Sequence, residues 1–535
     1  MKKSPREGVI ETFLVENVWG MGQAREVETK QAGEAKRHPK YRPIDRKQMS
    51  WVALDVENLI SPDHPARMIW GIVGRMDLSA WEKKVASFEK EAGRSAWPPR
   101  LLLSVLVYGY TLGTSSAREM ERWMEHEPGL RWLTGLDAIN HHTLSDFRTQ
   151  EVESLKGMLT QVLALLASED LVDFQTLLQD GTKIKAQAGK SSMHRRGTVS
   201  EQLEKARAFV AELERRAAEA PAESPLAAKR SKKEAAQERA ARERLARMEA
   251  AMRELEKREA AAEPGKKDEV RVSISEPEAR KMKHPDGSFA LSYNLQLVTE
   301  VKNGFPVGLL VTNTHNDLHE LEPGLAMAES CTQVEPQQVV TDKGYSRREN
   351  IEAMAERGIT LVAPRLSEDE RNAGALSKAG IDLAFAPSKF KLAADKQTMK
   401  CPAGAVLVQI KGGRHHGLPV QGYEAEAAVC GACAHKPQCC PKREARQIER
   451  VIESAAVEAH DQRMNDPVFQ DLYKKRKQLA EYPNLRIKSD WRLNRFRLRG
   501  LEKVNKEAFW MVLAFAMDRW HFQRQQIARA AKLAA

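Results

Sequence analysis

Three acidic residues stand where they could do chemistry together. Asp180 and Asp342 each follow a short apolar run and precede a glycine, Gly181 or Gly344, and Glu481 lies far downstream in a strongly basic stretch. Two aspartates at strand ends and a distant glutamate can supply the hard oxygen ligands that Mg²⁺ prefers. Two such ions activate the attacking oxygen and stabilise the leaving oxygen in a phosphodiester displacement. The three acids therefore predict an enzyme that cuts or joins nucleic acid.

Each acid also has a simpler explanation. An aspartate before a glycine is an ordinary turn residue, so the argument needs Asp180 and Asp342 together, on strands in a suitable order. Glu481 is followed by Pro483, which disfavours helix at Tyr482. Two other glutamates are alternatives for the third ligand, Glu502 and Glu507.

The charge of the chain is concentrated in the segment that carries Glu481. The 535 residues have a formal net charge of +11, and residues 471–535 alone contain 16 lysines and arginines against 6 aspartates and glutamates. This predicts a polyanionic partner near the third carboxylate. A basic tail unrelated to catalysis is the alternative. No apolar stretch reaches the ~18 residues of a membrane span, and the basic N-terminus lacks the apolar segment of a secretory signal.

The chain before the first strand is expected to be helical. We interpret residues 1–45 as a flexible tail and residues 46–170 as a bundle of short helices. Pro99 can open a helix, and Ser116 begins a capping-box pattern. Short helices with exposed arginines such as Arg148 suit a DNA-binding domain, but a helical dimerisation domain would look the same.

Residues 171–535 are expected to form a mixed-sheet domain. The predicted order is strand, strand, strand, helix, strand, helix, strand, which is that of a ribonuclease H-like core with its first and fourth strands side by side. Residues 198–262 have helical periodicity broken at Pro221 and Pro225, which predicts an inserted helical hairpin acting as a structural arm or dimer contact. Residues 465–535 are expected to form basic C-terminal helices. The predicted fold class is therefore multidomain α+β.

Five cysteines are clustered within residues 395–445. They include one Cys-x-x-Cys pair and are Cys401, Cys430, Cys433, Cys439 and Cys440. Four thiolates in a tetrahedron form a structural zinc site, with His435 as a substitute ligand. Reduced cysteines without metal are the alternative. Clustered rather than spread cysteines favour a reducing, cytoplasmic location, and Cys331 lies apart as an expected core residue.

The sequence resembles a known family, the DDE-type transposases of bacterial insertion sequences. The resemblance covers about residues 41–520 and concerns the group with a helical N-terminal domain and a ribonuclease H-like core. Its motifs are short, and their joint order makes the match specific. They are Asp63-His64-Pro65-Ala66-Arg67, Tyr108-Gly109-Tyr110, His142-Thr143-Leu144-Ser145-Asp146-Phe147-Arg148, Asp180-Gly181-Thr182-Lys183, Tyr293-Asn294-Leu295-Gln296, Asp342-Lys343-Gly344-Tyr345, Tyr473-Lys474-Lys475-Arg476 running to Glu481 and Lys488, and Arg499-Gly500-Leu501.

The resemblance implies a reaction and the residues that carry it. Asp180, Asp342 and Glu481 would hold two Mg²⁺ or Mn²⁺ ions, a water would cut at the transposon end, and the freed 3′ hydroxyl would attack target DNA. Residues around the glutamate would contact the DNA backbone at the cleaved end; these are Tyr473, Arg476 and Lys488. The resemblance also implies that a homodimer binds terminal inverted repeats in double-stranded DNA. It implies a location in the bacterial cytoplasm, associated with the nucleoid.

The chain departs from the family after Glu481. The family has an aromatic residue and a glycine beyond the proline, whereas Asn484, Leu485 and Arg486 follow here. The alternative function is therefore a transposase-derived protein that has lost catalysis and acts as a DNA-binding repressor or scaffold. The position of Glu481 relative to the two aspartates distinguishes these functions.

Overall fold

The computed structural model describes residues 47, 49, 53–85, 95–149, 152–219, 225–366, 368–415, 417–491 and 493–534. The chain divides into two compact units, 1–53 and 54–535, and all helices and strands named below belong to the second. The tail predicted over residues 1–45 lies outside the described residues. Helices are combined with several sheets, in agreement with a mixed α+β fold. Within the described residues, no helix has the length and apolar character needed to cross a membrane.

The first part of this unit is helical. Its helices are α1 (Pro65–Val73), α2 (Ser79–Glu82), α3 (Pro99–Thr111), α4 (Ala117–Trp123), α5 (Pro128–Thr134), α6 (His141–Arg148) and α7 (Val152–Ser168). Pro99 opens α3 as expected, because its fixed φ and missing N–H suit the first turn. Ser116 caps α4 by accepting the Glu119 N–H at 3.4 Å. The local signals for helix starts therefore operate as the sequence predicts.

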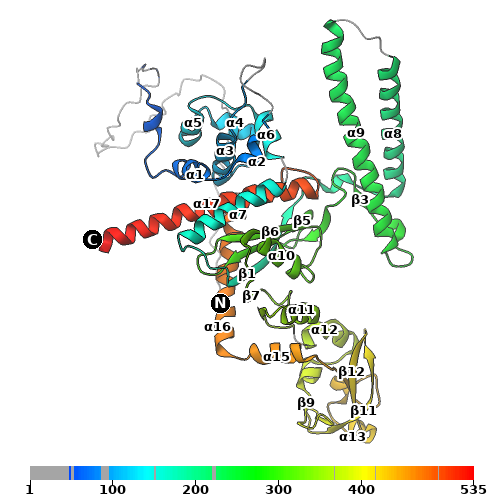
Figure 1. The fold of residues 1–535 in the computed structure, drawn as a ribbon. Coiled ribbons are helices and arrows are strands. Elements are labelled where there is room, and N and C mark those ends of the chain that lie inside the picture. The colour runs from blue at the N-terminus through cyan, green and yellow to red at the C-terminus, as the bar shows by residue number, and fades with distance from the viewer. Residues whose placement is uncertain are drawn as a thin grey trace, which may run out of the picture. The chain divides into compact units, whose positions relative to one another are not determined.

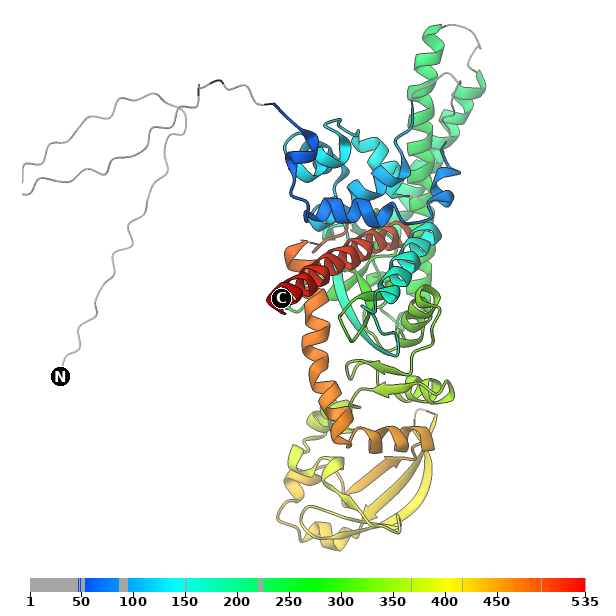
Figure 2. The same ribbon diagram turned by 60° about the vertical axis from the view of Figure 1, so that its left-hand side comes forward.

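The long C-terminal helix α17 (Leu501–Ala534) joins these helices to the sheet. Figures 1 and 2 show it running between the N-terminal helices and the strands. The indole N–H of Trp510 donates to the Arg148 carbonyl at 3.0 Å, and the Trp510 ring packs near Trp81 and Phe147. One continuous buried apolar cluster includes residues of the N-terminal helices, α17 and the sheet. The core therefore does not break at residue 170.

The central sheet has the strand order β5, β1, β7, β8. Both β4 and β6 pair with different parts of β5. Its strands are β1 (Thr176–Lys185), β4 (Arg280–Lys283), β5 (Phe289–Glu300), β6 (Pro306–Thr312), β7 (Gln338–Val340) and β8 (Thr360–Val362). β1, β5 and β6 pair antiparallel, and β7 pairs parallel with both β1 and β8. Helices α10 (Leu321–Thr332) and α11 (Arg348–Glu356) connect the parallel strands. β1 and β7, which correspond to the first and fourth predicted strands, are neighbours.

Two long antiparallel helices follow β1. They are α8 (Arg196–Glu219) and α9 (Pro225–Ala260), and Pro225 opens the second. Their mutual contact buries small apolar clusters that include Leu203 and Met248, and Val199 and Leu255. A two-stranded ribbon, β2 (Met193–His194) with β3 (Val272–Ser273), closes the base of the pair. The helical periodicity over residues 198–262 is therefore realised as two packed helices.

The clustered cysteines lie in the segments around a second antiparallel sheet. Its order is β13, β12, β11, β10, β9, with bounds β9 (Lys391–Leu392), β10 (Thr398–Lys400), β11 (Val406–His415), β12 (Leu418–Ala425) and β13 (Gln447–Val451). Helix α12 (Glu368–Ala379) precedes it, and α13 (Ala427–Gly431) and α14 (Lys436–Cys439) lie between β12 and β13. The sheet has its own small core. We refer to residues 391–451 as the cysteine lobe.

Helices α15 (Ala455–Arg463) and α16 (Pro467–Leu485) lead from the cysteine lobe to the central sheet. The expectation that Pro483 disfavours helix at Tyr482 is wrong, because α16 continues through both residues and passes into a π-helical turn (Arg486–Asp490). The Tyr482 hydroxyl accepts from Arg519 at 3.0 Å, and its ring packs near Phe515. These tertiary contacts outweigh the local preference of the residue before a proline.

Candidate functional site

Parallel pairing of β1 with β7 brings Asp180 and Asp342 together. Leu178 is paired with Val340, and each aspartate lies two residues beyond that pair. β1 continues to Lys185, so Asp180 lies within a strand and not at a strand end as expected, whereas Asp342 follows the end of β7. The two carboxylates are far apart in sequence and adjacent in space because of this register.

One guanidinium from α16 lies between the two carboxylates. Nη2 of Arg476 is 3.2 Å from Oδ1 of Asp180 and 3.9 Å from Oδ2 of Asp342. The side chains of Arg476 and Asp180 are only 18% and 20% exposed. A charge this far from solvent requires partners of opposite sign. Arg476 therefore balances the two acids, and its Nε is buried without a hydrogen-bond partner.

Asn484 approaches Asp180 from the same helix. Its Nδ2 donates to Oδ2 of Asp180 at 2.8 Å and to the Ala480 carbonyl at 3.1 Å. This amide orientation is the favourable one, because the reverse would place an oxygen against a carboxylate. Oδ1 of Asn484 is buried and accepts no hydrogen bond. A buried acceptor without a partner is costly, so the site contains an oxygen available to a ligand.

A third aspartate, which the sequence analysis did not identify, completes the site. Asp317 lies in the loop between β6 and α10, and its Oδ1 accepts from Asn294 and Gln296 at 2.7 Å each. The Tyr345 hydroxyl donates to Oε1 of Gln296 at 2.5 Å. The signal was available in β5, since two amides two residues apart on a buried strand need polar partners on one face.

Gly181 has a different role from the turn that was expected. It lies within β1, paired with Gln296. A Cβ at this position would lie 2.4 Å from Oδ1 of Asp317 and 2.6 Å from Nε2 of Gln296. A side chain at position 181 would therefore displace Asp317 and Gln296, and glycine permits their close approach to the strand that carries Asp180.

The environment of Asp180 favours its protonated form. Burial raises the pKa of Asp180 to about 6, against the lowering effect of Arg476 and with further raising by Asp342 and Asp317. Burial also lowers the pKa of Lys488, and the nearby Asp180 opposes that change. Perturbed acids and bases gathered at one place are typical of functional sites.

The structure does not bring any predicted glutamate to the aspartates. The side chain of Glu481 is 67% exposed, and it lies 3.9 Å from the ammonium of Lys477. Glu502 pairs with Lys506 at 2.7 Å, and Glu507 is buried where it accepts backbone N–H groups of the segment before α17. Glu481 lies three residues before Asn484 on α16, and Asn484 is the residue that reaches Asp180.

The residues expected to contact DNA fall into two groups. Arg476 and Lys488 lie beside Asp180, and Tyr473 lies near Lys343, which follows Asp342. Arg148 is different, because it is 6% exposed and donates to the Ser115 carbonyl. Its interior position, next to the buried Glu507, gives it a structural role and removes it from the surface available to DNA.

Two family models match the chain. A Transposase domain (DUF772) matches residues 54–150, and a Transposase DDE domain matches residues 400–521. The chain is a DDE-type transposase. No curated protein matches it. In this transposase the matched segments contain Arg476, Glu481 and Asn484. They contain neither Asp180 nor Asp342, so the support for these two aspartates is their position in the structure.

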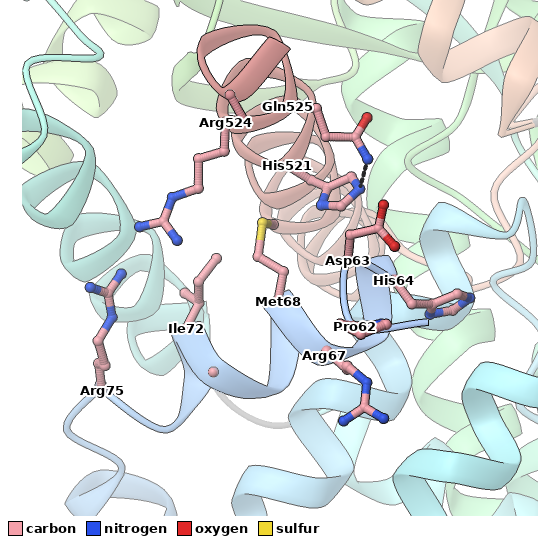
Figure 3. A pocket seen from close by; sticks show the side chains of 12 residues that line it. Pro62, Asp63, His64, Arg67, Met68, Ile72, Arg75, His521, Arg524 and Gln525 are labelled. Atoms are coloured by element: carbon pink, nitrogen blue, oxygen red, sulfur yellow. Dashed lines mark hydrogen bonds between the residues drawn. The ribbon is translucent and has the colours of Figure 1, made fainter. Parts of the chain in front are cut away.

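The transposase also has a groove between α1 and the C-terminal part of α17 (Figure 3). Its volume is about 590 Å³, and arginines line it. Arg75 and Arg524 both pair with Glu169, at 3.7 Å for Arg75. Arg67 pairs with Glu57 at 2.7 Å. Since these cations already have carboxylate partners, the groove is a weaker candidate for binding phosphate than the Asp180 site.

Proposed function

We propose that this transposase binds the terminal inverted repeats of its insertion sequence and catalyses metal-dependent strand cleavage and strand transfer at Asp180 and Asp342. The observation that carries the proposal is the parallel register of β1 and β7, which places both carboxylates beside one arginine. The strand order supports a ribonuclease H-like core, since three antiparallel strands are followed by two parallel strands on the far side of the first.

The donor atoms at this site fit magnesium. Asp180, Asp342 and the free Oδ1 of Asn484 are hard oxygens, and Asp317 lies behind them. Among the described residues no three His, Cys, Asp or Glu side chains already surround one point, and Arg476 occupies the space between the carboxylates. Two divalent ions held here would supply charge stabilisation for the attacking and leaving oxygens of the phosphodiester. Binding them requires Arg476 to move.

The remaining residues would hold the DNA. Arg476 presents a fork of donors that matches a phosphate, and Lys488 supplies a point charge. Displaced from the aspartates, the Arg476 guanidinium would lie within side-chain reach of the same site and could bind the phosphate backbone there. The basic segment 471–535 extends this positive surface. Two transposon ends require two such sites, which favours a homodimer on DNA.

One observation favours a second candidate, a transposase-derived DNA-binding protein without catalysis. Glu481 points to solvent, and an amide takes the place beside Asp180 where a third carboxylate was predicted. An amide oxygen binds a divalent cation but does not balance its charge. A chain with this site could bind DNA ends and fail to cut them.

Cleavage of labelled duplex DNA carrying the element's own terminal repeats tests the proposal. Wild type should nick the repeat boundary with Mg²⁺ or Mn²⁺, and Asp342→Asn should bind the same DNA without cutting it. Asp471→Asn is the matched control, because this carboxylate lies on α16 but is 66% exposed and paired with Lys474. Specific binding without cutting by wild type would favour the second candidate.

Two further variants decide which residue supplies the third oxygen. We expect Asn484→Ala to weaken metal-dependent cutting more than Glu481→Gln does, because Asn484 contacts Asp180 whereas the Glu481 side chain is exposed. The reverse order would mean that α16 turns when DNA binds and presents Glu481 to the aspartates.

A further inference from the structure

Five cysteines from separate segments of the cysteine lobe line one cavity. The cavity has a volume of about 250 Å³, and Phe385, Leu407 and Arg446 also line it. Cys401 follows β10, Cys430 lies in α13, Cys433 follows it, and Cys439 and Cys440 lie at the end of α14. All five are free thiols. Cysteines separated by up to 39 positions therefore meet because the lobe folds around them.

The backbone around Cys401 is arranged to donate to its sulfur. The Cys401 N–H donates to the Ala405 carbonyl at 2.8 Å, and the Gly404 N–H donates to the Cys401 carbonyl at 2.9 Å. Gly404 adopts a φ of +92°, which favours glycine. This tight turn directs the Ala405 N–H at Sγ of Cys401, with a distance of 3.1 Å. Hydrogen bonds to a ligand atom orient and stabilise it in metal sites.

The second segment supplies a pair of thiols at a suitable spacing. The Cys433 N–H donates to the Cys430 carbonyl at 3.2 Å, so a single turn separates the two residues. A Cys-x-x-Cys pair on one turn can present both sulfurs to one ion. Cys401, Cys430 and Cys439 also pack on the same small apolar cluster of the lobe.

A buried arginine gives an independent indication of negative charge in this cavity. Arg446 is 8% exposed, and its Nε has no hydrogen-bond partner. Its Nη2 donates to the Phe385 carbonyl at 3.0 Å, and its guanidinium lies 5.4 Å from the centre of the Phe390 ring. In the part of the chain that the structure describes, no carboxylate forms an ion pair with it. Arg446 lines the same cavity as Cys430, Cys439 and Cys440. A buried cation needs anionic partners, and thiolates bound to a metal would provide them.

The lobe has a small apolar core. Its buried cluster combines Phe390, which directly precedes the lobe, with Met399, Leu407, Tyr423, Ala425 and Ile448. A metal can reinforce a core of this size. The lobe also precedes α15 and α16, so its stability bears on the helix that carries Arg476 and Asn484.

We propose that the cysteine lobe binds one structural Zn²⁺ through Cys401, Cys430, Cys433 and Cys439. Cys440 is 4% exposed and stays in the core beside them. Within the described residues the thiols do not yet surround a single point, so binding requires their side chains to rotate toward the cavity. The site is separate from the Asp180 site, and its occupancy is measured without DNA, so either proposal can fail alone.

Metal content of the purified full chain tests this proposal. We expect one zinc per chain after expression with zinc, and at least about a tenfold loss in Cys430→Ser and Cys401→Ser. Cys331→Ser is the matched control, because Cys331 is a buried cysteine of α10 outside the lobe, and it should keep its zinc. Replacing zinc by Co²⁺ should give the thiolate charge-transfer absorption of a tetrahedral site.

Three results would overturn the proposal, and the first two are measured on the wild-type chain, so they do not depend on the variants folding. Wild-type chain that contains no zinc and shows no thiolate absorption with Co²⁺ rules out the site. If a chelator removes zinc from the wild-type chain and the proteolysis of residues 391–451 does not change, the zinc has no structural role. Retention of zinc by Cys433→Ala together with its loss in Cys440→Ala would refute the assigned set of ligands.

Discussion

Replacing Asp180 by asparagine is expected to stabilise this transposase at neutral pH when divalent metal is removed. The carboxylate is buried beside Asp342 and Asp317, and its pKa is raised to about 6. Asparagine resembles the protonated acid in shape and removes the buried negative charge. A site built to hold cations is therefore expected to cost stability when it is empty, which is a common relation between stability and function.

The size of the expected stabilisation by Asp180→Asn follows from the raised pKa of Asp180. The rise from the ordinary value of 3.8 to about 6 corresponds to about 3 kcal/mol at about 1.36 kcal/mol per pKa unit. Arg476 loses part of its ion pair in the variant, so the expected gain is about 1–3 kcal/mol. The side chain is 20% exposed, so solvent screens the charge only in part.

The sign of the pH dependence follows from the same shift. Because the folded pKa is above the unfolded value, the folded chain binds the additional proton more tightly. This contribution to wild-type stability is fully present below about pH 4 and is lost as the pH rises through about 6. The advantage of Asp180→Asn should therefore shrink by about 1.4 kcal/mol between about pH 7.5 and about pH 5.

Urea unfolding with EDTA, followed by the fluorescence of buried residues such as Trp510, measures this difference. Added Mg²⁺ should raise the free energy of unfolding of wild type by about 2.7 kcal/mol at a hundredfold excess over the dissociation constant. It should not raise that of Asp180→Asn. Asp471→Asn is the control, since this exposed carboxylate should change stability by less than about 0.5 kcal/mol. A variant no more stable than wild type at about pH 7.5, or a gain that is equal at both pH values, would refute the reasoning.

Two further predictions concern residues whose roles the structure changed. Gly181→Ala should lower the free energy of unfolding by about 1–3 kcal/mol, because its methyl would clash with Asp317, as measured by denaturant unfolding. Gly157→Ala is the control and should be neutral or stabilising by about 0.5–1 kcal/mol, since it lies in α7 with no atom within 4 Å of the added carbon. Arg148→Ala should lower the free energy of unfolding by about 1–3 kcal/mol, because the buried Ser115 carbonyl loses its donor and the buried Glu507 loses a nearby positive charge. A folded Arg148→Ala chain of wild-type stability with weakened DNA binding would restore Arg148 to the DNA-contact surface.

Local patterns in the sequence were enough to predict the two inserted helices and the main strands of the central sheet, but not the five-stranded sheet of the cysteine lobe. The periodicity of residues 198–262 is realised as α8 and α9, and the alternation after residue 171 is realised as strands in the predicted order. These predictions succeed because helix and strand repeats are set by neighbours in the chain. The adjacency of Asp180 and Asp342 could also be anticipated, since it follows from strand order.

The composition of the site was decided by tertiary structure. Asp317 lies in a loop with no periodic signal, and it matters only because β5 carries two buried amides toward it. Asn484 reaches Asp180 and Glu481 does not, because the rotation of α16 is set by packing against the sheet and α17. The sequence by itself determined which residue types are available and which elements carry them. Only long-range packing determined which side chains converge, because that depends on contacts between segments that no local pattern connects.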